Sequence, residues 1–308
     1  MSGVLRGTYS IVAADPDARE VGCAVQSRYF AVGAAVPWVR AGVGAVATQA
    51  FALSASGPRL LDALAAGEDP AAALQRVVDE DERSARRQYG IVTAEGRAFS
   101  FTGAECNDWA GDRQGENYAV QGNILAGAGV IDAMVRSFEE SAGSGRPLAD
   151  RLMDVLDAAE AAGGDSRGKQ SAALIVERAG AAEVTPLGID RVVDLRVDDH
   201  EEPLLELRRL LGIHWSLSYS LASYWHYERG DYERAIESMQ PALERTPDAA
   251  LAWFNVACYE ALAGRRDDAL EHLRRAVELD PGMRDQARAD ADFASLQADD
   301  EFRRIVAG

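Results

Sequence analysis

Lysine is almost absent from this sequence. Its 308 residues include 32 Lys and Arg against 50 Asp and Glu, and Lys169 is the only lysine among these bases. The formal net charge of −18 argues against binding to nucleic acid or to an anionic membrane surface, because both require a basic patch. We therefore expect neither nucleic acid nor a membrane among its partners.

Cysteines and long apolar runs are also scarce. Cys23, Cys106 and Cys258 are odd in number and far apart, which favours free thiols in a reducing compartment over a disulfide framework. Cys23 and Cys106 have no paired base nearby in sequence and are interpreted as buried or idle thiols. No apolar run reaches the length of a membrane span, and the N-terminus lacks the features of a secretory signal. We expect a cytoplasmic protein.

Several motifs with known chemistry are missing or lack their context. GVGAVA at 42–47 matches a dinucleotide-binding pattern, but no amphipathic helix follows it. The sequence has no serine nucleophile elbow, no phosphate-binding loop and no Cys/His cluster with zinc spacing. The acidic group Asp194, Asp198, Asp199 and His200 has oxygen ligands for a divalent cation, but a solvated strand end is the preferred interpretation. No cofactor or metal is expected.

Two segments near the C-terminus repeat each other. Glycines, alanines and prolines recur 34 residues apart, in the pairs Gly230 and Gly264, Ala235 and Ala269, Ala242 and Ala276, and Pro247 and Pro281. This period with these residues is the signature of the tetratricopeptide (TPR) repeat. Glycine would form the turn inside each helical hairpin, alanine would let helices approach, and proline would begin the next unit.

Two repeats need flanking helices, since stacking requires about three units or a cap. Apolar residues at helical spacing over 287–306 predict a capping segment, and residues 204–221 predict a helix on the other side. An all-α TPR-like domain is therefore predicted over 213–308. It would dock a protein or peptide partner, or else pack on its own N-terminal domain or on a second copy of the chain.

The first two hundred residues alternate between strands and helices. Strands are predicted over 8–15, 21–30, 41–51, 89–103 (a hairpin turning at Glu95 and Gly96), 117–125, 171–180 and 191–199. Helices are predicted from Pro58 with Ser56 as the cap, and over 70–78, 130–140 and 148–162. Hairpins make the sheets antiparallel, and two such sheets covered by helix pairs form a four-layer α+β sandwich, here over 7–212.

Four segments of this domain carry a family resemblance. They are TYSIVAADPDAREVGCAVQSRYF from Thr8, YAVQGNILAG from Tyr118, GGDSRGKQSAALIV from Gly163 and VDLRVDDH from Val193. In this order they resemble the successive blocks of a bacterial and archaeal family, domain of unknown function 1028. That family is similar in fold to the N-terminal-nucleophile (Ntn) hydrolases, which include proteasome β-subunits. The resemblance implies an αββα Ntn-hydrolase-like sandwich, and it gives no substrate.

Ntn hydrolases use the first residue of the mature chain, whose hydroxyl or thiol attacks a carbonyl. The α-amine of the same residue acts as the base, and its pKa of about 7.7–8.0 suits neutral pH. The resemblance implies Thr8 for this role, because Thr8 opens the first predicted strand and follows Gly7. Cleavage after Gly7 would remove residues 1–7 and expose the nucleophile.

The resemblance also suggests supporting residues. Arg28, at the end of the second predicted strand, would lower the pKa of the nucleophile. Asp165 would orient it, and Lys169 shares the loop of Asp165. Asn123 would donate a hydrogen bond to an oxyanion. Each of these residues also has a structural interpretation, as a surface ion pair, a turn residue or a strand-end cap.

The sequence leaves two functions open. An Ntn-type amidohydrolase would cleave amide or peptide bonds through Thr8, and the repeat would recruit or screen its substrates. A non-catalytic Ntn-like scaffold would use the repeat to bind a partner protein. A homo-oligomer is expected in either case, because Ntn-like domains often assemble and the repeat adds a contact surface.

Overall fold

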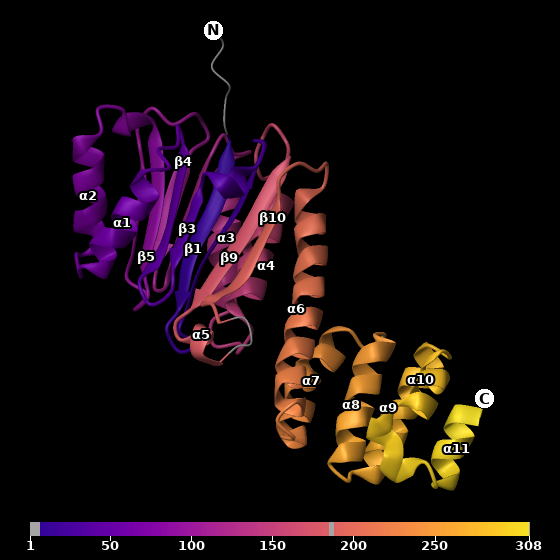
Figure 1. Cartoon of the computed structure of the whole chain (residues 1–308). Helices are drawn as coiled ribbons and strands as arrows, with labels where there is room; N and C mark the ends of the chain where they lie inside the picture. The colour runs from indigo at the N-terminus through magenta and orange to yellow at the C-terminus, as the bar shows by residue number, and fades with distance from the viewer. Residues whose placement is uncertain (1–6, 185–187, 308) are drawn as a thin grey trace. The chain divides into compact units, whose positions relative to one another are not determined.

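The structure is a computed structural model that describes residues 7–184 and 188–307 (Figure 1). The chain divides into two compact units, one ending at Leu210 and the other beginning at Leu211. None of the described helices has both the length and the apolar character that crossing a membrane requires.

The larger sheet of the N-terminal unit has the strand order β10-β9-β2-β1-β8-β7, and each neighbouring pair is antiparallel. Its strands are β1 Thr8–Asp15, β2 Glu20–Ser27, β7 Gly111–Gly115, β8 Tyr118–Asn123, β9 Ser171–Arg178 and β10 Arg191–Val197. Because β1 is an inner strand, its first residue, Thr8, is held from both sides.

The smaller sheet has the order β3-β4-β5-β6 and is also antiparallel. Its strands are β3 Pro37–Arg40, β4 Gly44–Ala50, β5 Arg87–Thr93 and β6 Ala98–Thr102. The two antiparallel sheets with helices confirm the predicted α+β class.

The two sheets face each other, and helices cover their outer faces (Figure 1). Small and β-branched side chains such as Val12, Val25 and Ala47 fill the space between the sheets. Helices α1 (Ser56–Ala65) and α2 (Pro70–Glu80) pack on the outer face of the smaller sheet through an apolar cluster. Helices α3 (Ala128–Glu140) and α4 (Leu148–Ala161) cover the larger sheet. Short elements complete the unit: 3-10 turns η1 Val32–Ala34 and η2 Ser84–Arg86, and helix α5 Ala181–Val184.

Some local predictions were wrong. Ser56 does not cap α1: it is the first helical residue, and its buried hydroxyl accepts a hydrogen bond from the Tyr89 hydroxyl at 3.3 Å. The strands β3 and β7 were not predicted. Both are edge strands: β3 begins with Pro37, which edge positions tolerate, and β7 is polar and partly exposed.

The C-terminal unit consists of helical hairpins, as the 34-residue period predicted. Its helices are the C-terminal part of α6 (Pro203–Tyr227), α7 Tyr232–Arg245, α8 Ala250–Leu262, α9 Arg266–Leu279, α10 Met283–Ala289, η3 Ala291–Leu296 and α11 Asp300–Ala307. Gly230 and Gly264 have φ of 71° and 79°, which favours glycine at these turns. The four repeated alanines are buried, and Phe293 and Phe302 of the predicted cap lie in the same core.

Candidate active site

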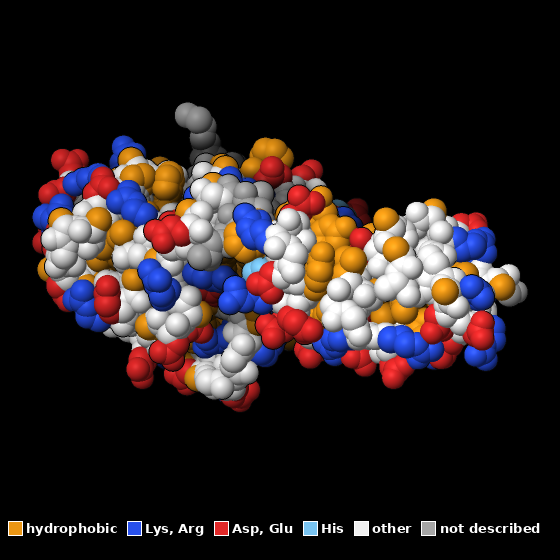
Figure 2. All heavy atoms as spheres, turned by 60° about the horizontal axis from the view of Figure 1, so that its bottom comes forward, with side chains coloured by type: hydrophobic (Ala, Val, Ile, Leu, Met, Phe, Trp, Pro, Cys, Tyr) orange, Lys and Arg blue, Asp and Glu red, His pale blue; other side chains and the backbone are white. Residues whose placement is uncertain are grey.

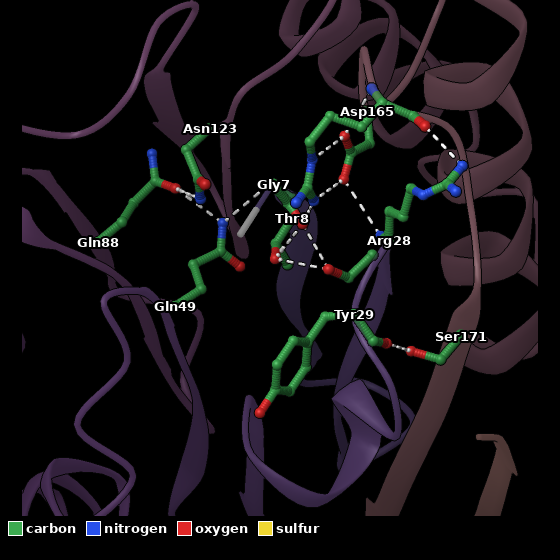
Figure 3. Close-up of polar contacts among 11 residues, drawn as sticks. Gly7, Thr8, Arg28, Tyr29, Gln49, Gln88, Asn123, Asp165 and Ser171 are labelled. Atoms are coloured by element: carbon green, nitrogen blue, oxygen red, sulfur yellow. Dashed lines mark hydrogen bonds and ion pairs between the residues drawn. The ribbon is translucent and has the colours of Figure 1, made fainter. Parts of the chain in front are cut away.

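Thr8 lies at the beginning of β1, and its side chain is buried. In the sheet it is opposite Ser27 of β2 on one side and Asn123 of β8 on the other. Its Oγ1 lies 3.0 Å from Oγ of Ser27 and donates to the carbonyl oxygen of Gly7 at 2.6 Å (Figure 3). The predicted nucleophile is therefore in contact with the peptide bond that precedes it.

The carbonyl oxygen of Gly7 accepts hydrogen bonds from three groups. Besides Thr8, the Ser27 hydroxyl donates to it through a short contact, and Nη2 of Arg167 donates at 3.0 Å. A guanidinium and a second hydroxyl thus surround the oxygen on which negative charge would develop if the carbonyl carbon were attacked.

Asp165 holds the guanidinium in place. Its carboxylate accepts from Nε and Nη2 of Arg167 at 3.0 and 2.6 Å, and from the backbone N–H groups of Arg167 and Arg28 at 3.0 and 3.2 Å. The Asp165 side chain is completely buried. A buried carboxylate with four hydrogen bonds is a rigid element of the site.

Arg28 reaches this site through its backbone. Its N–H binds Asp165, while its guanidinium Nη1 donates to the carbonyl oxygen of Arg167 at 2.8 Å (Figure 3). The Arg28 side chain is therefore directed at the loop that carries Asp165, and the guanidinium that contacts Gly7 belongs to Arg167.

Lys169 pairs with acidic residues around the same loop. Its Nζ lies 2.5 Å from Oε2 of Glu202 and 3.4 Å from Oε1 of Glu160, and the hydrogen bond that Nζ donates to Glu202 raises the pKa of Lys169 above its ordinary value. Glu160 also accepts from the Tyr9 hydroxyl at 2.9 Å. Lys169 thus remains protonated at neutral pH and ties the loop to its surroundings.

Asn123 belongs to a buried row of amide side chains between the sheets. Its Nδ2 donates to Oε1 of Gln88 at 2.9 Å, and Nε2 of Gln49 donates to the same oxygen at 2.8 Å (Figure 3). Gln49 lies within 3.4 Å of the Thr8 carbonyl oxygen, and Gln121 bonds to Ser10. The row holds the end of β1 that carries Thr8 in position.

Sequence reasoning missed Ser27, Arg167 and the glutamines. Gln49, Gln88 and Gln121 each lie beside apolar residues of a buried strand, and this pattern could have indicated a polar site between the sheets. Ser27 and Arg167 carried no such signal, because their importance depends on where Gly7 lies in space.

The thiols do not offer a competing nucleophile. Burial raises the pKa of Cys106 to about 11, and burial also raises the pKa of Cys23 and Cys258. Thiolates are the reactive form, so these cysteines are weak nucleophiles near neutral pH.

The acidic group at the end of β10 does not form a metal site within the part of the chain that the structure describes. Asp194 pairs instead with Arg191 and Arg196, and Asp199 accepts from Gln170. The ligand atoms of Cys258, Asp290 and Asp292 in the C-terminal unit do lie within 4.8 Å of one another. The Asp290 carboxylate already accepts a hydrogen bond from the backbone N–H of Asp292 at the start of η3. The Asp292 carboxylate accepts one from the Tyr227 hydroxyl.

The surface charge agrees with the acidic composition. Figure 2 shows Lys and Arg side chains interspersed with Asp and Glu over the face in view, without a continuous basic area among the side chains described there. That face therefore lacks the basic stripe that phosphate backbones require.

Comparisons with known proteins cover both units. Residues 8–207 match the model of a family of unknown function, DUF1028, and residues 226–284 match a tetratricopeptide repeat. The crystal structure of protein SPO2555 from Silicibacter pomeroyi, described as belonging to DUF1028, is similar to this chain with a TM-score of 0.61 and 29% identity. The match covers 69% of this chain and 90% of that one. No curated protein matches this chain significantly. Because the first match spans more than half of the sequence, the chain belongs to the DUF1028 family, and a tetratricopeptide repeat region follows that domain.

Proposed function

We propose that the N-terminal unit is an Ntn-type amidohydrolase that activates itself by cleavage between Gly7 and Thr8. The observation that carries this proposal is the arrangement around the Gly7 carbonyl. The Thr8 hydroxyl lies against it, and the Ser27 hydroxyl and the Arg167 guanidinium bind its oxygen. The sandwich of two antiparallel sheets, with Thr8 first in an inner strand, also supports the Ntn type.

Self-cleavage begins when Oγ1 of Thr8 bonds to the carbonyl carbon of Gly7. The C–N bond breaks, its nitrogen takes up the hydroxyl proton, and Gly7 becomes the acyl part of an ester on Thr8. Water hydrolyses this ester. The segment ending at Gly7 leaves as a carboxylic acid, and Thr8 keeps a free α-amine, which the peptide bond had prevented from acting as a base.

Substrate hydrolysis follows the same course. The α-amine of Thr8 accepts the proton of its own hydroxyl while Oγ1 attacks a substrate amide, and the leaving amine takes the proton. The Arg167 guanidinium and the Ser27 hydroxyl stabilise the oxyanion. Asp165 and the Arg28 N–H hold Arg167, while Lys169 fixes the loop and Asn123 supports the row of amides.

The hydrolase is tested by assaying purified protein against chromogenic amides while its N-terminus is sequenced. The proposal predicts an N-terminus that reads TYSIV and an activity that Thr8→Ala abolishes. Activity in the Thr8→Ala protein would exclude Thr8 as the nucleophile.

The second candidate function is a non-catalytic scaffold. The C-terminal unit supports it, because a tetratricopeptide repeat suggests protein–protein interaction. Ile213, Leu217, Leu221 and Tyr224 recur on one face of α6 and are between 44% and 60% exposed. This stripe carries no charged side chain, so a second copy can cover it without removing a charge from water. We infer that the stripe contacts a second copy of this chain.

A further inference from the structure

Position 7 has room only for glycine. A Cβ atom built on Gly7 would lie 2.6 Å from Oδ2, 2.7 Å from Cγ and 2.7 Å from Oδ1 of Asp165. Contacts this short are far inside the van der Waals separation. The Asp165 carboxylate therefore occupies the place where any other side chain at position 7 would begin.

The carboxylate cannot easily give way. Its hydrogen bonds to the Arg167 guanidinium and to the backbone N–H groups of Arg28 and Arg167 come from several directions. The Asp165 side chain is also fully buried. Moving it would break charge-assisted hydrogen bonds and displace the same guanidinium that binds the Gly7 carbonyl oxygen.

If the proposed hydrolase function holds, the residue at position 7 also indicates which acyl groups the site accepts. During self-cleavage, Gly7 becomes an ester on Oγ1 of Thr8. The acyl-enzyme formed from any substrate is the same ester, with the acyl group of the substrate in place of Gly7. The space beside Asp165 that receives the Gly7 α-carbon therefore also receives the α-carbon of the substrate acyl group.

We propose that Asp165 makes this enzyme selective for amides whose carbonyl is next to an unsubstituted CH₂, above all glycyl amides and glycyl peptides. In each turnover Oγ1 of Thr8 bonds to the glycyl carbonyl carbon and the amide C–N bond breaks. The hydroxyl proton passes through the α-amine to the leaving amine, and water then releases the acyl group as a carboxylic acid. A methyl group on the α-carbon meets the carboxylate of Asp165, as a Cβ at position 7 would.

The first test compares N-acetylglycyl and N-acetyl-L-alanyl p-nitroanilide on one preparation whose intact mass is known. We expect kcat/KM to be about 100-fold higher for the glycyl compound, since steric exclusion of one methyl group reaches this order. Equal rates for the two compounds would overturn the selectivity. A processed protein that cleaves neither compound would also overturn it, while leaving self-cleavage standing. An unprocessed protein that cleaves neither would overturn the proposed function as well.

The second test uses the self-cleavage reaction. Gly7→Ala should remain folded by circular dichroism and should lose cleavage after residue 7. Gly129→Ala is the matched control, because a Cβ built on Gly129 in α3 meets no atom within 4 Å, and it should cleave like the parent protein. Cleavage of Gly7→Ala at the parent rate would overturn the role of Asp165.

Discussion

Oγ of Ser27 lies 3.0 Å from Oγ1 of Thr8, and both hydroxyls donate to the carbonyl oxygen of Gly7. The pairing of β1 with β2 places the two residues directly opposite each other, so this arrangement depends on the register of the central strands. Thr8 supplies the attacking oxygen in the proposed mechanism. Ser27 supplies a hydrogen bond to the oxygen that gains charge.

Ser27→Ala is therefore expected to slow self-cleavage by about 100-fold, because one donor to the oxyanion is lost while the nucleophile remains. The measurement is the rate at which the N-terminal segment is released, followed by mass spectrometry. An unchanged rate in a folded Ser27→Ala protein would remove Ser27 from the mechanism. A fold check is essential, since Ser27 is fully buried.

Arg167 is expected to contribute through its charge and its planar geometry. Arg167→Lys keeps the charge but loses the two-atom contact with Asp165, so we expect a loss of about 10-fold to 100-fold in the self-cleavage rate. Arg167→Met should lose more, about 1000-fold, because the charge also disappears. If both variants cleave like the parent protein, Arg167 has only a structural role. Arg113→Met is the control, because it removes a guanidinium from the edge strand β7, and it should cleave like the parent protein.

The repeat unit should be less stable at high pH because of one ion pair whose carboxylate is buried. Nδ1 of His272 on α9 lies 2.8 Å from Oε2 of Glu260 on α8, and Glu260 is buried. The hydrogen bond that His272 donates to Glu260 raises the pKa of His272 above its ordinary value of 6.5, with smaller effects from Glu271 and Asp268. The stabilisation is thus fully present below about pH 6.5 and is lost as the pH rises through the raised pKa of the folded state.

The measurement is the free energy of unfolding of the full chain and of His272→Gln at about pH 5.5 and about pH 8.5. The stability difference between the two proteins should be larger at the lower pH. Glu260→Gln should remove the same dependence, because it removes the partner carboxylate. A difference that does not change with pH, or that grows at high pH, would contradict this account of the pair.

The exposed stripe on α6 leads to a prediction about assembly. Leu217→Glu should prevent the proposed association of two copies, because it places a charge in the centre of the apolar face. The mass in solution is measured by light scattering. Leu251→Glu is the control, because Leu251 is also exposed but belongs to α8. A parent protein that is monomeric at all concentrations would exclude the second copy and leave a different partner for this face.

The sequence was sufficient for those parts of the structure that depend on local pattern. The repeat followed from the spacing of Gly230 and Gly264, and the first strand from the apolar run after Thr8. The edge strand β3 was missed because it begins with a proline, and β7 was missed because it is polar and partly exposed.

The candidate site was only partly predictable, for a physical reason. Thr8 and Asp165 could be named because each lies in a segment that resembles a known family. Arg167 is two residues from Asp165, but its importance comes from a contact with Gly7 across 160 positions of sequence. No local sequence pattern encodes a contact of this kind. Nor does any local pattern show that position 7 has room only for glycine, since the Asp165 carboxylate that fills the space is distant in sequence.

The central claim is that Thr8 becomes the first residue of the mature chain by attacking the bond that precedes it. The most direct measurement is the intact mass of the purified protein, followed over time beside Thr8→Ala. The account predicts that the parent chain loses residues 1–7 and that Thr8→Ala keeps them. A parent chain that retains those residues indefinitely, or a Thr8→Ala chain that loses them equally fast, would contradict it.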